Sequence, residues 1–204
     1  LAIVMLLAGL LPVYAADVVT TEPSPLQESS TGVVVYFHAD RGTKGLAGTQ
    51  PATALYAHTG VITSESTNSS DWKHAPDWNK NLDKYKLVFV RPDLWKLDIG
   101  DIRTFYNLNP GEKVHRLAFV FRNADGSKQG KDDGGADIFV DVMEEGFQLS
   151  LSSDLDGNII TDKNNTVTFR ISATSAATLS LSVNGAVVKS QEDVSTLEVP
   201  YTFA

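Results

Sequence analysis

Apolar and polar residues alternate along most of this chain with the period of two that is typical of β-strands. The alternation is clearest in residues 114–142, where two such runs, 117–122 and 138–142, lie on either side of a polar segment rich in Asp and Gly. Both residue types favour the backbone conformations that turns require. We therefore predict two strands joined by a long exposed loop, with the preceding elements arranged around them.

Shorter alternating runs precede this pair of strands. They occupy residues 33–38, 54–62, 85–90 and 94–99, and clusters of turn-forming residues separate them. Short strands with turn signals between them are typical of a β-sandwich. One segment departs from the pattern, because Ile102 and Phe105 follow the acidic Asp101 at helical spacing and Pro110 comes soon afterwards. We predict a short helix there.

A second unit is predicted after Gly146. It contains alternating runs at residues 147–151, 167–173, 179–183, 187–190 and 194–201. Asn184-Gly185, between two of these runs, is the strongest hairpin signal in the chain. The unit resembles an immunoglobulin-type sandwich but is shorter than the usual module, so it is either compact or truncated. The predicted fold is all-β, with two immunoglobulin-like β-sandwich modules in tandem, residues 31–144 and 145–204, and one short helix in the first.

The first residues are predicted to lie outside these modules. Residues 1–11 form an apolar run as long as a signal-peptide core, and Ala15 ends a small-residue cleavage site. We expect a signal peptide at residues 1–15 and hence a secreted or outer-surface location; a hydrophobic anchor or a buried helix is the alternative. Residues 16–30 are rich in Thr, Ser, Pro and Glu, which predicts an extended linker. Because no initiator Met is present, we expect the chain to be part of a longer gene product.

Composition narrows the classes of partner. The net charge of the 204 residues is -8 and the Lys and Arg residues are scattered, so the chain lacks the basic surface that nucleic acids or anionic membranes require. Neutral or cationic partners fit better. Cysteine is absent, which excludes disulfides and thiolate metal sites.

Motifs for catalysis are missing from the sequence. It contains no G-x-S-x-G, H-E-x-x-H, P-loop or G-x-G-x-x-G pattern, and its 4 histidines lie on different segments without metal-ligand spacing. The Asp-rich segments at residues 125–137 and 154–158 could bind calcium, but Asp and Gly are also typical of solvated turns. We predict no catalytic residue, no metal ion and no cofactor in this chain.

Aromatic residues are more informative. Tyr56 and His58 lie on one face of the strand predicted at residues 54–62 and form a surface that is both polar and aromatic. The loop that follows carries Trp72 and Trp78 among charged residues, whereas a tryptophan of the core would usually have apolar neighbours. We assign Trp95 to structure.

Exposed tryptophans of this kind suit a sugar ligand. A flat indole face stacks on the apolar face of a sugar ring, and neighbouring polar groups bind its hydroxyls. The alternative for either tryptophan is a cap on the sandwich. The candidate ligand-binding residues are Tyr56, His58, Asp71, Trp72, Lys73 and Trp78.

A series of short motifs occurs in one order along residues 31–142. They are Val33-Val-Val-Tyr-Phe, Leu55-Tyr-Ala-His-Thr-Gly, Asp71-Trp-Lys-His-Ala-Pro, Leu94-Trp-Lys-Leu, Leu117-Ala-Phe-Val-Phe-Arg-Asn-Ala-Asp-Gly-Ser and Asp137-Ile-Phe-Val-Asp-Val. This order resembles the N-terminal module of secreted bacterial α-amylase-type enzymes of glycoside hydrolase family 13. More distantly, it is similar to starch-binding modules of carbohydrate-binding module family 26.

The resemblance implies that Tyr56 and Trp72 stack on α-glucan. His58 and Trp78 have no counterparts in the family pattern, and the loop at residues 126–135 is longer. The resemblance also implies a second non-catalytic module from Phe147 onward and, in the full protein, a catalytic (β/α)₈ barrel whose conserved motifs are absent from this chain. We therefore predict a starch-binding region of a secreted glycosidase, without hydrolase activity of its own. A structural or adhesive cell-surface protein without glycan binding is the alternative.

Overall fold

A computed structural model describes residues 4–5, 17–153 and 166–203. It confirms the all-β prediction, because strands dominate and α1 (Ile102–Tyr106) is the one α-helix among the described residues. The chain forms two compact units, Asp17–Glu145 and Gly146–Ala204 with the start of the chain. In the described part, no helix is long and apolar enough to cross a membrane.

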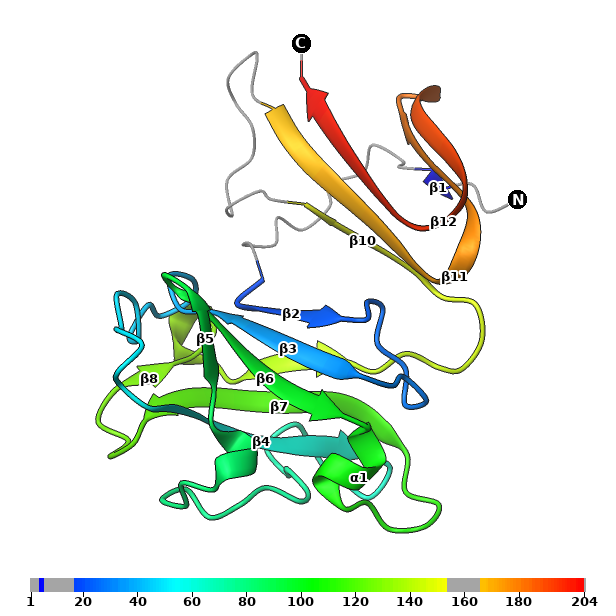
Figure 1. The fold of residues 1–204 in the computed structure, drawn as a ribbon. Coiled ribbons are helices and arrows are strands. Elements are labelled where there is room, and N and C mark those ends of the chain that lie inside the picture. The colour runs from blue at the N-terminus through cyan, green and yellow to red at the C-terminus, as the bar shows by residue number, and fades with distance from the viewer. Residues whose placement is uncertain (1–3, 6–16, 154–165, 204) are drawn as a thin grey trace. The chain divides into compact units, whose positions relative to one another are not determined.

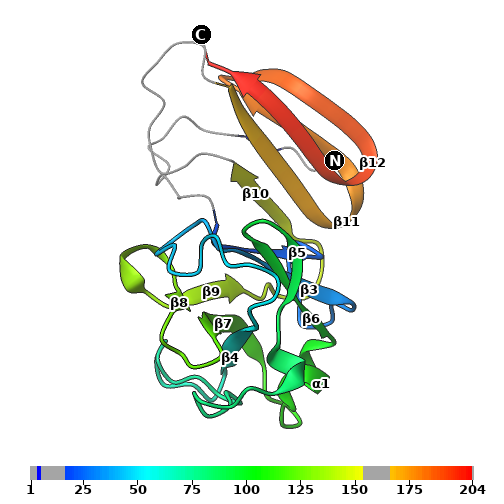
Figure 2. The same ribbon diagram turned by 60° about the vertical axis from the view of Figure 1, so that its left-hand side comes forward.

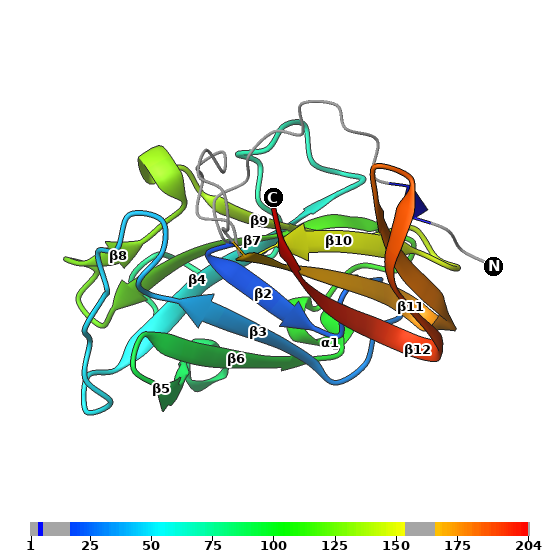
Figure 3. The same ribbon diagram turned by 90° about the horizontal axis from the view of Figure 1, so that it is seen from above.

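Two antiparallel sheets make up the first unit. The first sheet contains, in order of hydrogen bonding, β2 (Val19–Glu22), β3 (Val33–His38), β6 (Leu94–Gly100) and β5 (Val88–Arg91). The second sheet contains β4 (Leu55–Thr63), β7 (Val114–Asn123), β8 (Gln129–Gly130) and β9 (Ile138–Asp141). Figure 3 shows β2, β3 and β6 side by side, and β8 and β9 both lie beside β7 in Figure 2.

Alternate residues of the two sheets point inward and form one apolar core. On β3, the buried residues Val33, Val35 and Phe37 alternate with half-buried ones. Phe37 stacks on Phe121 of the second sheet, with 4.1 Å between the ring centroids. Gly130 permits this contact, because a Cβ at that position would lie 2.4 Å from Phe37 Cζ.

The prediction of a linker at residues 16–30 is wrong for the part that the structure describes. Within the described residues 17–30, Val19–Glu22 form β2, which pairs antiparallel with β3, and Val19 and Leu26 are buried in the core. Leu26 O accepts a hydrogen bond from Met143 N at 2.7 Å. Composition misleads here because β2 is held by backbone hydrogen bonds to β3, which any residue except Pro can donate.

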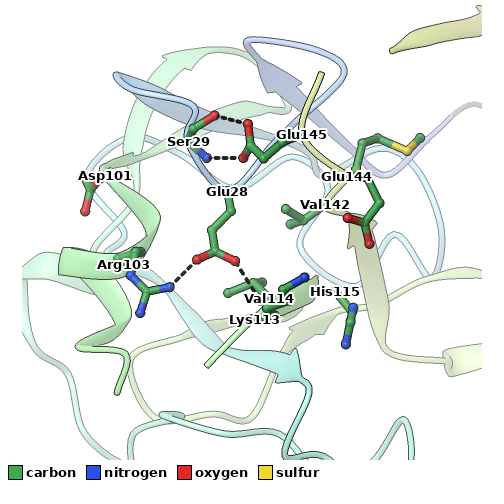
Figure 4. A pocket seen from close by; sticks show the side chains of 11 residues that line it. Glu28, Ser29, Asp101, Arg103, Lys113, Val114, His115, Val142, Glu144 and Glu145 are labelled. Carbon is green, nitrogen blue, oxygen red and sulfur yellow. Dashed lines mark hydrogen bonds and ion pairs between the residues drawn. The ribbon is translucent and has the colours of Figure 1, made fainter. Parts of the chain in front are cut away.

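The end of the predicted linker contacts the end of the unit (Figure 4). Glu28 forms an ion pair with Arg103 and accepts a hydrogen bond from Val114 N at 3.0 Å. Ser29 Oγ donates to Glu145 Oε2 at 2.6 Å. These residues line a cavity of about 370 Å³, and protein groups already hydrogen-bond both carboxylates. We therefore assign these contacts to closing the sandwich.

The short helix lies where the sequence predicts it. α1 begins after Asp101, whose side chain accepts a hydrogen bond from Thr104 N at 2.7 Å, and it ends at Asn107 in the left-handed conformation. The strand predicted at residues 85–90 is shorter than expected. A 3₁₀ helix, η1 (Asp83–Tyr85), precedes it, and β5 begins only afterwards.

The second unit forms one bent sheet in its described residues. The sheet consists of β10 (Leu149–Ser153), β11 (Thr166–Val183) and β12 (Ala186–Thr202), with β1 (Val4–Met5) parallel to β11. The four runs predicted as separate strands after residue 166 are therefore two long strands, joined at the predicted Asn184-Gly185 turn. The pairing shifts register between Ser172 and Ala177, and apolar residues on both sides of this shift join one core.

Two predictions fall outside the described residues. They are the signal peptide at residues 1–15, of which only Val4–Met5 is described, and the Asp-rich turn at residues 154–158.

Candidate ligand-binding site

The outer face of the second sheet carries polar and aromatic side chains. Tyr56 and His58 on β4 alternate with buried residues, so they point away from the core. The strand register places Tyr56 opposite Arg122 and His58 opposite Val120 on β7. This surface is the floor of the candidate site.

The loop between β4 and β5 folds back over this floor. Val61 and Lys73 exchange two backbone hydrogen bonds of 2.8 and 3.0 Å, which hold the loop against β4. In Figure 1 the loop, drawn in teal, lies on the side of β4 away from β3. Gly60 makes the close approach possible, because a Cβ there would lie 2.8 Å from Lys73 O. The neighbouring Trp72 is thereby stacked on His58, with 5.6 Å between ring centroids and 25° between planes.

Trp78 from the same loop contacts His58 as well. Its ring meets the imidazole edge-on, with 4.8 Å between centroids and 64° between planes. Gly126, in the turn after β7, lies against this indole, since a Cβ there would be 3.0 Å from Trp78 Nε1. Its φ of +73° also favours glycine. Two tryptophans therefore contact one imidazole on the sheet.

Beside these rings lies a cavity of about 390 Å³. Its polar side comes from the segment after β7, which supplies Gln129, Lys131 and Asp137; Lys131 Nζ lies 3.0 Å from Asp137 Oδ1. The predicted ligand-binding residues do not include these three, although the greater length of their loop is visible in the sequence and Asp137 lies in the segment considered for calcium. The lining residues are His58, Ser70, Asp71, Trp72, Ala75, Trp78, Val120, Gln129, Lys131 and Asp137, and we call this cavity the aromatic cavity.

The structure brings most of the predicted site residues to this cavity. His58, Asp71, Trp72 and Trp78 line it, whereas Tyr56 and Lys73 do not. The Tyr56 ring instead lies 5.7 Å from the guanidinium carbon of Arg122. Lys73 Nζ forms an ion pair with Asp71 Oδ1 at 2.9 Å. Of the pair predicted to stack on a sugar, Trp72 lines the cavity and Tyr56 does not, whereas Trp78 lies beside Trp72 in the lining.

Both carboxylates of the aromatic cavity have cationic partners. Asp137 is paired with Lys131, and Asp71 is paired with Lys73. Hydrogen bonds from Thr67 N and then from Lys73 hold the pKa of Asp71 below its ordinary value. Since each negative charge has a positive neighbour, the cavity favours a neutral polar ligand over an ion.

The surroundings of His58 favour its neutral form. Burial lowers its pKa, Arg122 lowers it further, and the opposing effect of Asp137 is smaller. A neutral imidazole has one donor and one acceptor nitrogen, so it can pair with hydroxyl groups of either role.

The aspartates of the neighbouring turns act within those turns. Asp125 Oδ1 accepts a hydrogen bond from Ser127 N at 2.9 Å. Asp132 Oδ1 accepts one from Asp133 N at 2.9 Å, at the start of the 3₁₀ helix η2 (Asp133–Gly135). Across the described ranges, no group of three or more His, Cys, Asp or Glu residues could hold a metal ion.

Comparison with known proteins does not assign this chain to a family. The chain matches no family model, and no curated protein sequence is significantly similar to it. The chemistry of the aromatic cavity and the motif order of the chain are therefore the grounds for a functional proposal.

His74 attaches the loop that carries the tryptophans at a further point. Its Nε2 lies 2.8 Å from Glu112 Oε2, and Asn109 N donates to the same oxygen at 3.1 Å. Glu112 is only 2% exposed. This contact connects the loop after β4 to the segment before β7, so its loss should weaken the first unit.

Glu112→Gln is expected to make the stability of the first unit less sensitive to acid. Burial raises the pKa of Glu112, but hydrogen bonds from His74, Thr63 and Asn109 N together outweigh burial and hold the pKa below its ordinary value. A carboxyl group whose pKa is lower in the folded state stabilises the fold at pH values above its unfolded-state pKa. This stabilisation is lost as the pH falls through the folded-state pKa. The free energy of unfolding in urea, measured from about pH 7 to about pH 3, should fall less steeply for the variant.

The exposed Glu65 provides a matched control for this experiment. Glu65→Gln should leave the acid dependence as it is in the parent protein, because the side chain stays in water. Parallel pH curves for the parent and Glu112→Gln would contradict the assigned role of Glu112.

Proposed function

We propose that the first unit binds α-glucan in the aromatic cavity. The observation that carries this proposal is the grouping of Trp72 and Trp78 around His58, beside polar groups whose charges are paired. Sugar rings present an apolar C–H face and a rim of hydroxyls, which suits indole rings next to neutral donors and acceptors. A volume of about 390 Å³ lies within the range of small-molecule pockets.

Each part of the cavity has a role in this proposal. The indoles of Trp72 and Trp78 supply apolar surface for stacking, and His58 binds hydroxyls as a neutral donor and acceptor. Gln129, Lys131 and Asp71 supply further hydrogen bonds from opposite sides. No member of this set is a nucleophile with an adjacent base, and we assign it to binding.

The resemblance to α-amylase-type enzymes extends the proposal to the parent protein. We infer that the chain belongs to the non-catalytic N-terminal region of a secreted or cell-surface glycosidase, with the catalytic barrel of the same protein as its partner. The first unit would then hold the enzyme on starch. The second unit carries no proposed ligand.

Titration of the protein with maltoheptaose should change its tryptophan fluorescence and release heat in a calorimeter. Two of its 3 tryptophans line the cavity, so a ligand that stacks there alters their surroundings. Cellohexaose, which has β-linkages and a different chain shape, is the control and should produce a smaller response. Absence of both heat and fluorescence change with maltoheptaose and soluble starch would favour a structural or adhesive module instead.

A further inference from the structure

Arg122 on β7 is a buried cation without a carboxylate partner. The residue is 2% exposed, and none of the ion pairs among the described residues includes it. Burying a charged group costs free energy unless other groups compensate for lost water. The burial of Arg122 beneath the site therefore indicates that its hydrogen bonds have a role besides packing.

The Arg122 guanidinium binds two separate loops. In the loop that carries Trp78, Lys80 O accepts a hydrogen bond from Nη2 at 3.1 Å and Asn81 Oδ1 accepts one from Nη1 at 2.8 Å. At the end of β7 and the start of the turn that follows, Asn123 O and Ala124 O accept hydrogen bonds from Nη1 at 3.1 Å and 3.3 Å. Asn81 Nδ2 joins the loops directly, because it donates to Ala124 O at 3.0 Å.

These two loops carry the two sides of the aromatic cavity. Lys80 and Asn81 follow Trp78 closely, and Asn123 and Ala124 begin the turn that leads to Gln129. The guanidinium carbon also lies 5.6 Å from the Trp78 ring, within the range of a cation–π contact.

We propose that Arg122 is a positioning residue that holds the Trp78 side and the Gln129 side of the aromatic cavity at a fixed separation. It does not line the cavity, so it acts through these loops and not by touching the ligand. The planar fork of an arginine can donate to several carbonyls in one plane while aromatic rings lie near it, which a lysine ammonium cannot reproduce. The consequence for binding rests on the proposed glucan function, whereas the consequence for Trp78 does not.

Arg122→Met is expected to release Trp78 and to weaken binding of maltoheptaose about tenfold, comparable to losing one stacking contact. Incorporation of 5-fluorotryptophan into the full chain gives one fluorine NMR signal for each of the 3 tryptophans, and Trp→Phe variants assign them. In Arg122→Met the Trp78 signal should shift and broaden, while the signal of the core residue Trp95 stays in place. Arg122→Lys should restore the Trp78 signal and the affinity only in part.

Arg116→Met is the matched control, because Arg116 lies on the same strand with its side chain exposed and paired with Asp141. It should change neither the Trp78 signal nor the affinity.

If Arg122→Met does not fold, Arg122→Lys and Asn81→Ala carry the same test, since each weakens the connection between the loops. A lower melting temperature with an unchanged Trp78 signal and unchanged affinity would overturn the proposal and leave Arg122 a structural residue. If the parent protein binds no glucan, the proposed function fails, and the Trp78 signal alone still decides the positioning role.

Discussion

Replacing Trp72 with alanine is expected to remove most α-glucan binding while folding stays cooperative. The ring stacks on His58 and meets Phe139 edge-on at 6.2 Å, on the outer face of the second sheet and outside the apolar core. A stacking contact on an aromatic ring is worth about 1–3 kcal/mol, which corresponds to roughly 5-fold to 150-fold in Kd. Calorimetric titration with maltoheptaose and thermal unfolding followed by circular dichroism measure the two quantities separately.

Trp95→Phe is the control for this variant. Trp95 is 2% exposed and lies in the core between the two sheets, away from the lining of the aromatic cavity. We expect it to lower the melting temperature and to leave the affinity for maltoheptaose unchanged.

The opposite pattern for Trp72→Ala would assign Trp72 to structure. Truncating a tryptophan of the core to alanine lowers the free energy of unfolding of a protein by about 3–5 kcal/mol. A variant that melts far below the parent protein, yet binds starch equally well at low temperature, would exclude a stacking role for Trp72.

Replacing Leu26 with alanine is expected to destabilise the first unit by about 2–5 kcal/mol. Leu26 is 2% exposed and belongs to the same core as β3 and β7, although it lies within residues whose composition predicts an extended linker. Removing its side chain leaves a cavity that the rigid sheets fill only in part. Urea unfolding, followed by tryptophan fluorescence, reports on this unit because all 3 tryptophans lie in it.

Thr20→Ala is the matched control in the same segment. Thr20 is exposed on β2 and its Oγ1 lies 3.2 Å from His38 Nε2, so its truncation removes one exposed hydrogen bond and should change the free energy of unfolding by no more than about 1 kcal/mol. An effect of Leu26→Ala as small as that of Thr20→Ala would mean that residues 17–30 do not contribute to the core.

Local patterns were sufficient to predict most of the first unit. Alternation identified β3, β6 and β7 within a few residues, because each presents one face to a core and one to the opposite side. The acidic cap and apolar spacing identified α1. The same alternation placed Tyr56 and His58 together on one outer face. These features depend on neighbours in sequence, so the sequence contains them directly.

Only the tertiary structure decided which distant segments meet. β2 could not be predicted, because its pairing with β3 uses backbone groups that are the same in every residue type. The grouping of Trp72 and Trp78 around His58 depends on a loop that crosses the sheet, and Gly60 allows its close approach. Long-range contacts of this kind have no local period in the sequence. For the same reason Gln129, Lys131 and Asp137 became visible as the second side of the cavity only when the chain was folded.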